Sequence, residues 1–200
     1  MLTSRTGLTY EAYLALPETM QRYEIIDGEL IMSPSPDFEH QWRSTAIYDP
    51  MKQYVHTNRL GIVLYAPLDI MIQQSPLRTR QPDILYISLD RIRHFGLDSI
   101  KGVPFFSFPP DLVVELVSPS ESKRRIEDKL IDYCKIGVQE CWLVRPRDET
   151  VEVLQLKADS SQQLGLFGCG ETLRSAVLPR WSPAIDDFFA PPDFLKWLEM

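Results

Sequence analysis

The segment that most constrains the fold is residues 111–117, Asp-Leu-Val-Val-Glu-Leu-Val. Side chains alternate between the two faces of a strand, and from residue 112 to residue 117 both faces are apolar apart from Glu115. A strand that is apolar on both faces belongs in the middle of a sheet. The sequence therefore predicts a central strand with a carboxylate inside it.

Length and composition bound the rest of the chain. With 200 residues, of which 44% are hydrophobic, we expect a single domain over residues 1–200. A formal charge of −7 excludes a protein that binds nucleic acid over its whole surface, although a local basic strip is compatible with it. Three cysteines without CxxC spacing indicate neither a disulfide framework nor a zinc site. Because the sequence has no signal-peptide pattern and no long apolar run, we expect a soluble cytoplasmic protein that does not enter a membrane.

Hydrophobic periodicity and turn residues predict the remaining elements. Helices are expected over residues 9–16, 37–58 and 120–136, the second kinked or interrupted by Pro50 and the third closed by Gly137. A hairpin over residues 22–32 turns at Asp27-Gly28. Strands are expected over residues 62–72, bent at Pro67, and over 82–88, 138–144 and 150–156. Residues 89–110 read as an irregular excursion, and the aromatic tail of residues 173–200 is expected to dock on the domain.

Two carboxylates are the candidate chemical groups. Burying Glu115 without a cation would be costly or would force its protonation, so it is either half of a structural salt bridge or a functional carboxylate. Asp83 follows Pro82 at the head of a predicted strand, where an Asp can also cap a turn. If both lie near the same sheet edge, they form a hard-oxygen site of the kind that Mg²⁺ uses.

Lys129 is the third candidate. On the helix predicted from residue 120, Lys129 falls on the apolar stripe that faces the sheet, whereas Asp128, Asp132 and Lys135 are expected to point outward. A lysine in this position either covers core surface with its stem or meets Glu115 on the preceding strand.

The order of these motifs resembles the Uma2 family of restriction-endonuclease-like proteins, from about residue 10 to residue 189. The resemblance rests on Arg22-Tyr-Glu-Ile-Ile-Asp-Gly-Glu-Leu30, His40, Pro82-Asp83, the strand of Glu115 with Ser118-Pro119-Ser120, Asp128-Lys129-Leu-Ile-Asp-Tyr133 and Gly137-Val-Gln-Glu-Cys-Trp142-Leu-Val. It implies an α/β fold of the PD-(D/E)XK nuclease type, a mixed sheet flanked by helices, with the hairpin as an N-terminal extension. Its site would hold Mg²⁺ or Mn²⁺ on Asp83, Glu115 and the backbone carbonyl of Leu116.

The chain departs from the general nuclease motif at two positions. The lysine expected two residues after the glutamate is Val117 here, and the resemblance implies that Lys129 supplies it from the following helix. Arg145 stands where similar proteins often have an Asp before a Pro, and the sequence assigns this change no consequence. Glu24 and His40 match family positions and are accessory candidates, although a hairpin and a helix start also give them structural roles.

The resemblance implies a metal-dependent endonuclease that cleaves nucleic acid, with DNA the expected substrate. Its phosphate contacts would come from Arg78, Arg80, Lys123, Arg124 and Arg125, unless these only solvate a charged helix end. Two other functions stay open: a non-catalytic interaction protein that keeps the nuclease fold, and a hydrolase of another phosphate ester. A direct Lys129–Glu115 ion pair that closes the site would favour the interaction protein. A homodimer is expected because nuclease-like domains often pair and the tail offers apolar surface.

Overall fold

The structure is a computed structural model that describes residues 7–17, 19, 21–102 and 105–192. Its α-helices are α1 (Tyr10–Leu14), α2 (Phe38–Thr57), α3 (Leu89–Phe95), α4 (Lys123–Ile136) and α5 (Ile185–Phe189), with short 3₁₀ turns at Leu97–Ser99 and Pro146–Asp148. Its strands are β1 (Tyr23–Ile26), β2 (Glu29–Met32), β3 (Gly61–Tyr65), β4 (Ile70–Gln74), β5 (Leu77–Arg80), β6 (Ile84–Ser88), β7 (Leu112–Leu116), β8 (Glu140–Arg145), β9 (Thr150–Lys157) and β10 (Ser160–Gly168). No helix within these ranges is long and apolar enough to cross a membrane.

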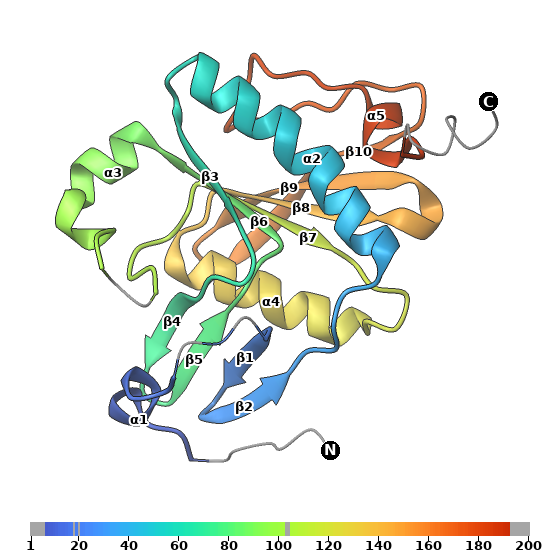
Figure 1. Ribbon diagram of the computed structural model, residues 1–200. Helices are drawn as coiled ribbons and strands as arrows, with labels where there is room; N and C mark the ends of the chain where they lie inside the picture. The colour runs from blue at the N-terminus through green and yellow to red at the C-terminus, as the bar shows by residue number, and fades with distance from the viewer. Residues whose placement is uncertain (1–6, 18, 20, 103–104, 193–200) are drawn as a thin grey trace.

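The larger sheet has six strands in the order β10-β9-β8-β7-β6-β3. Strands β7 and β8 are parallel, and the other neighbouring pairs are antiparallel. A parallel pair needs a crossover connection, which α4 provides between these two strands (Figure 1). All five residues of β7 are buried, so the predicted central strand is confirmed.

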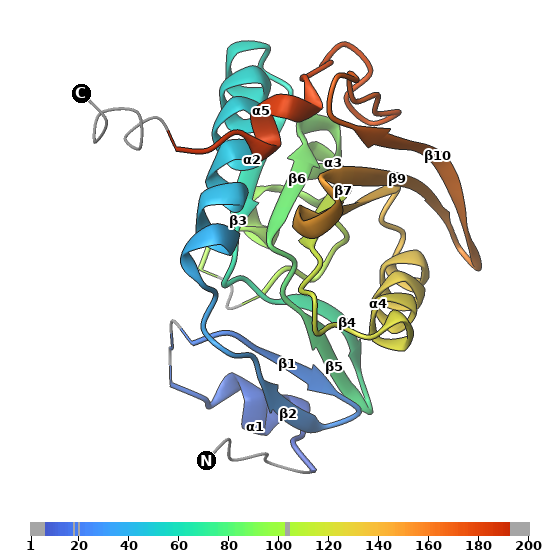
Figure 2. The ribbon, with the colours of Figure 1, turned by 90° about the vertical axis from the view of Figure 1, so that its right-hand side faces the viewer.

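Helices cover both faces of this sheet, and the alternation of β7 decides which side chain meets which helix. Helices α2 and α5 lie on one face and α4 on the other (Figures 1 and 2). Val114 packs in the cluster that includes Met51 of α2, whereas Val113 packs with Tyr133 of α4. Glu115 follows the alternation of Val113 and therefore points toward α4. The mixed α/β fold with flanking helices is confirmed.

A second, four-stranded sheet in the order β2-β1-β5-β4 lies along α4, which it contacts from Arg125 to Lys135 (Figure 1). Its hydrophobic cluster with α1 includes Tyr13, Ile25 and Leu77. The predicted hairpin at Asp27-Gly28 is confirmed, with positive φ values of 52° and 79° at the two turn residues. The sheet matters for function because it carries Arg22 and Glu24 toward the end of β7.

Three predicted segments differ from the structure, and two observed strands have no predicted counterpart. Residues 62–72 form β3 and β4 in different sheets, because Pro67 lacks the N–H needed to continue a ladder. Residues 89–110 contain α3, and β5 and β10 were not predicted because both are rich in polar side chains. Pro50 does not interrupt α2, whose buried face holds the helix against the sheet on both sides of it.

The helix ends and the tail agree well with the sequence. Thr9 caps α1, and Gly137 ends α4 in the left-handed conformation with φ of 88°. Helix α4 begins at Lys123, three residues after the predicted start, because Ser122 caps it. The described part of the tail, residues 173–192, docks as expected, with Leu173 and Phe188 fully buried against the sheet, while residues 193–200 lie outside the described residues.

Candidate active site

Asp83 and Glu115 are brought together by the antiparallel pairing of β6 with β7. Ile84 pairs with Val114, so Asp83, one residue before β6, lies opposite the end of β7. The backbone N–H of Leu116 donates a hydrogen bond of 2.7 Å to Asp83 Oδ2. Both carboxylates are only 4% exposed, and the charge of Asp83 acts on Glu115. The pair predicted from two separate strands is therefore adjacent in the fold.

Asp83 is held by two groups from other elements. Arg22 Nη1 lies 2.5 Å from Asp83 Oδ1, and His40 Nε2, on α2, lies 3.4 Å from the same oxygen. Burial alone would raise the pKa of Asp83, but the hydrogen bond from His40 and the charge of Arg22 outweigh it and lower the pKa to about 2. Asp83 is therefore ionised at neutral pH.

Arg22 was missed as a site residue although it begins the family-like hairpin. The available signal was Asp83 itself. If Asp83 is buried, it needs a cation partner, just as Glu115 does. No pattern in the sequence connects residue 22 with residue 83, because they meet only through the pairing of the two sheets.

Glu115 is held entirely from α4. Lys129 Nζ lies 2.7 Å from Glu115 Oε2, and the Tyr133 hydroxyl donates a hydrogen bond to Glu115 Oε1. Lys129 and Tyr133 are four residues apart, so they share the helix face that packs on β7. Burial raises the pKa of Glu115, although the charge of Lys129 opposes this. Burial disfavours a charged Lys129, but neighbouring carboxylates, Glu115 first, outweigh it and raise the pKa of Lys129.

The Lys129–Glu115 ion pair is direct, but it does not close the site. Asp83, Glu115 and Lys129 all line one cavity of about 790 Å³. Glu24 and His40 line the same cavity, so both accessory candidates lie near the carboxylate pair. It is bounded further by Arg22, the Ser118–Glu121 loop and Arg125.

Glu24 and Glu121 add negative charge around Lys129. Glu24 Oε2 accepts hydrogen bonds from Arg80 at 3.1 Å and from Arg125 at 3.2 Å. Glu121 Oε1 lies 3.0 Å from Lys129 Nζ. Lys129 is therefore fixed between two carboxylates, which orients its ammonium toward the end of β7.

The oxygen donors of this site suit a hard divalent cation. Each oxygen of Asp83 and Glu115 accepts hydrogen bonds from one or two donors, and a carboxylate offers about four lone-pair sites. The described residues contain no cluster of three or more His, Cys, Asp or Glu side chains arranged for a metal ion. Mg²⁺ needs no such cluster, because it binds through one or two carboxylates and keeps several waters.

Arg78 and Arg80 are not surface residues, contrary to the expectation that they contact phosphates. They are 8% and 1% exposed, and both guanidinium groups contact Asp128 and Asp132 of α4 at 2.5–2.7 Å. Residues two apart on a strand face the same way, as do residues four apart on a helix. The outward orientation expected for Asp132 is therefore wrong, since its side chain is buried in this network.

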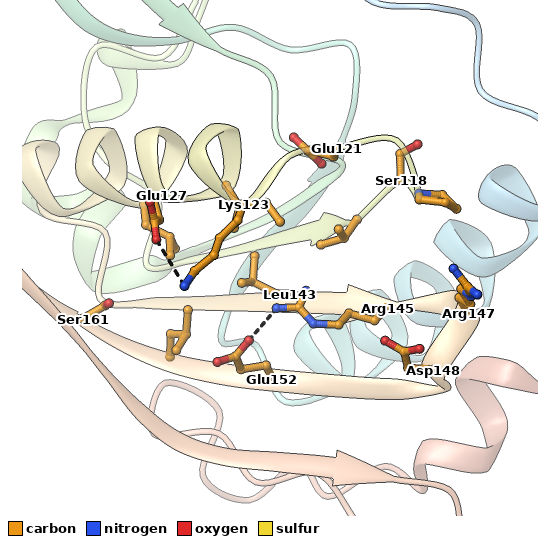
Figure 3. A pocket seen from close by; sticks show the side chains of 15 residues that line it. Ser118, Glu121, Lys123, Glu127, Leu143, Arg145, Arg147, Asp148, Glu152 and Ser161 are labelled. Atoms are coloured by element: carbon orange, nitrogen blue, oxygen red, sulfur yellow. Dashed lines mark hydrogen bonds and ion pairs between the residues drawn. The ribbon is translucent and has the colours of Figure 1, made fainter.

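The start of α4 carries the remaining basic candidates. Lys123 and Arg124 are exposed, and Arg125 is about half exposed while it contacts Glu24. Lys123 and Glu127, one turn apart on α4, form an ion pair of 3.8 Å in the lining of a second cavity of about 710 Å³ (Figure 3). In the same view Arg145 forms an ion pair of 2.8 Å with Glu152 on the neighbouring strand. The sequence assigned Arg145 no consequence, and the structure gives it this cross-strand contact.

Comparisons with known proteins identify the fold and the family. The crystal structure of a protein described as a putative nuclease of DUF820, from Anabaena variabilis, superposes with a TM-score of 0.73 at 22% sequence identity, covering 92% of this chain and 98% of that one. This likeness shows the shared fold. No curated protein matches the sequence. The model of the Uma2 family, described as putative restriction endonucleases, matches residues 10–186, and the chain therefore belongs to the Uma2 family.

Proposed function

We propose that this protein is a metal-dependent endonuclease that hydrolyses the phosphodiester bonds of DNA. The observation that carries the proposal is the buried Asp83–Glu115 pair, with Lys129 on Glu115, at the wall of a 790 Å³ cavity. A pair of buried carboxylates with a lysine is a costly arrangement for stability alone. The family description, which names restriction endonucleases, supports the same reading.

Asp83, Glu115 and the carbonyl of Leu116 would hold the Mg²⁺ or Mn²⁺ ion. When bound, the ion neutralises phosphate charge and lowers the pKa of a water molecule. Neighbouring carboxylates, Glu115 first, raise the pKa of Lys129, so its ammonium is protonated before an ion binds. It therefore offsets the negative charge that develops on the phosphate in the transition state. Tyr133 and Glu121 orient Glu115 and Lys129 for these roles.

The start of α4 supports nucleic acid as the substrate despite the net charge of −7. Lys123 and Arg124 are exposed, and Arg125 lines the cavity of the carboxylate pair. Phosphate contacts of this kind position a duplex without reading its sequence. We expect Arg124→Gln to weaken binding of any DNA sequence and to reduce its salt dependence.

We also propose a homodimer, since cutting both strands of a duplex calls for two sites. Within the described residues, the tail does not supply the interface expected from the sequence, because Leu173, Trp181 and Phe188 are buried within the chain. Strand β10 is the better surface: it is an edge strand of nine residues with exposed Leu164 and Leu166 and no charged side chain. A sedimentation mass of one chain at micromolar concentration would contradict this.

The test of the proposed activity is cleavage of DNA, RNA and small phosphodiesters with Mg²⁺ or Mn²⁺. We expect DNA cleavage that Glu115→Gln reduces by at least about a hundredfold, because a metal ligand is lost. Glu127→Gln on the exposed side of α4 makes the same chemical change and should leave the rate unchanged. Cleavage of only the small phosphodiesters would instead identify a hydrolase of another phosphate ester.

A non-catalytic interaction protein is the alternative, since the Lys129–Glu115 ion pair is direct, although it leaves the cavity open. Absence of cleavage on every substrate, together with no Mn²⁺ binding in calorimetry, would refute the nuclease proposal in favour of this one.

A further inference from the structure

Arg22 occupies the side of Asp83 that faces the cavity. Its Nη1 lies 2.5 Å from Asp83 Oδ1, and its Nη2 donates a hydrogen bond of 2.8 Å to the carbonyl of Gln81. Arg22, Gln81 and Asp83 all line the 790 Å³ cavity. The two terminal nitrogens thus hold the guanidinium between the Asp83 carboxylate and the Gln81 carbonyl.

The contacts of Arg22 do not use all of its hydrogen-bond donors. Its Nε is buried and makes no hydrogen bond within the described residues. A buried donor without a partner is a cost to the folded protein. The position of this arginine is therefore set by its contact with Asp83 and not by a complete set of structural hydrogen bonds.

Both carboxylates of the pair already have a cation partner before any ion binds. Arg22 neutralises Asp83, and Lys129 neutralises Glu115. Lys129 also contacts Glu121, and Glu24 contacts Arg80 and Arg125. A divalent cation that binds Asp83 and Glu115 must therefore approach two resident cations or displace one of them.

Of the two resident cations, Arg22 is the one that can more easily leave its carboxylate. Lys129 is 12% exposed and is fixed between Glu115 and Glu121. Arg22 is 21% exposed, and its ion pair among the described residues is with Asp83 alone. Asp83 Oδ1 accepts from Arg22 and lies 3.4 Å from His40, whereas Oδ2 accepts from the Leu116 N–H, so an ion that binds through Oδ1 meets the Arg22 guanidinium.

We propose that Arg22 is a built-in competitor of the divalent cation for Asp83, so that the site binds the ion weakly until the guanidinium leaves. The inference rests on the proposed metal site. Removal of one charge-assisted hydrogen bond that competes with the ion should raise the affinity of the site for the ion by about tenfold or more. The guanidinium fork also matches a phosphate, which gives a released Arg22 a partner on the substrate.

The experiment is a calorimetric titration with Mn²⁺ alone, on the full chain and its variants. Arg22→Gln is expected to bind Mn²⁺ about tenfold or more tightly than the unmodified protein. Arg22→Lys keeps the charge without the fork and is expected to show a smaller gain. The matched control is Arg43→Gln: Arg43 also has a buried, unpaired Nε within the described residues, but it contacts Glu39 and Ala190. Its Mn²⁺ affinity should not change.

The possible failures are distinguishable. Equal Mn²⁺ affinity in Arg22→Gln and the unmodified protein, with binding lost in Asp83→Asn, would overturn the inference and leave the metal site standing. No Mn²⁺ binding in any variant would overturn the metal site and the inference with it. Should circular dichroism show that Arg22→Gln is unfolded, Arg22→Lys decides: unchanged affinity in that variant counts against competition.

Discussion

Arg80 offers the sharpest test of how the site is supported. Its side chain is 1% exposed and contacts Glu24 at 3.1 Å, Asp128 at 2.5 Å and Asp132 at 2.6 Å. It therefore connects the smaller sheet to α4, the helix that carries Lys129. We predict that Arg80→Met, which keeps the stem and removes the charge, strongly destabilises the fold.

The size of the loss in stability depends on which carboxylates the other cations still contact in the variant. Removing one partner of a buried ion pair costs about 3–5 kcal/mol because a charge is left uncompensated. Here Arg78 still contacts Asp128 and Asp132, and Arg125 still contacts Glu24. The lower end, about 3 kcal/mol, is therefore expected. With a urea m-value of about 3 kcal/mol/M, the unfolding midpoint should fall by about 1 M.

The assay is equilibrium unfolding in urea, followed by tryptophan fluorescence, to which the buried Trp142 contributes. Arg93→Met is the control, since the Arg93–Asp90 pair is 73% and 92% exposed and should contribute less than about 1 kcal/mol. If the two variants lost similar free energy of unfolding, the network around Arg80 would not support α4 as argued.

Two further predictions concern buried carboxylates. The pKa of Asp83 is lowered from 3.8 to about 2, so its stabilisation is complete above about pH 4 and is lost as the pH falls toward 2. When the pH falls from about 5 to about 2, the free energy of unfolding should drop by about 2 kcal/mol less in Asp83→Asn than in the unmodified protein. Urea titrations at each pH measure this difference, and parallel pH profiles of the two proteins would contradict it. Glu140 is fully buried and accepts from Trp142, Ser175 and the Ala176 N–H. In Glu140→Gln the amide NH₂ group faces these donors, so the free energy of unfolding should fall by about 1–3 kcal/mol, as measured by thermal or urea unfolding. An unchanged free energy of unfolding would show that these contacts do not anchor the tail.

The sequence alone determined the features that depend on near neighbours in the chain. Alternating apolar residues predicted β7 as a central strand, and Asp27-Gly28 and Gly137 marked their turn and helix end, because a backbone conformation is chosen locally. The same local logic placed Lys129 on the inner face of α4, where it meets Glu115. The lysine of the site was therefore predictable even though the strand position holds Val117.

Only the tertiary structure decided which charges meet across the two sheets. Arg78 and Arg80 read as a basic rim in the sequence, but β5 pairs with β1 and turns both toward Asp128 and Asp132 of α4. Arg22 reaches Asp83, 61 residues away, only because the smaller sheet packs beside the end of β7. Burial makes these pairings necessary, since a carboxylate or guanidinium removed from water needs an opposite charge, but which partner it finds depends on contacts that no local pattern specifies.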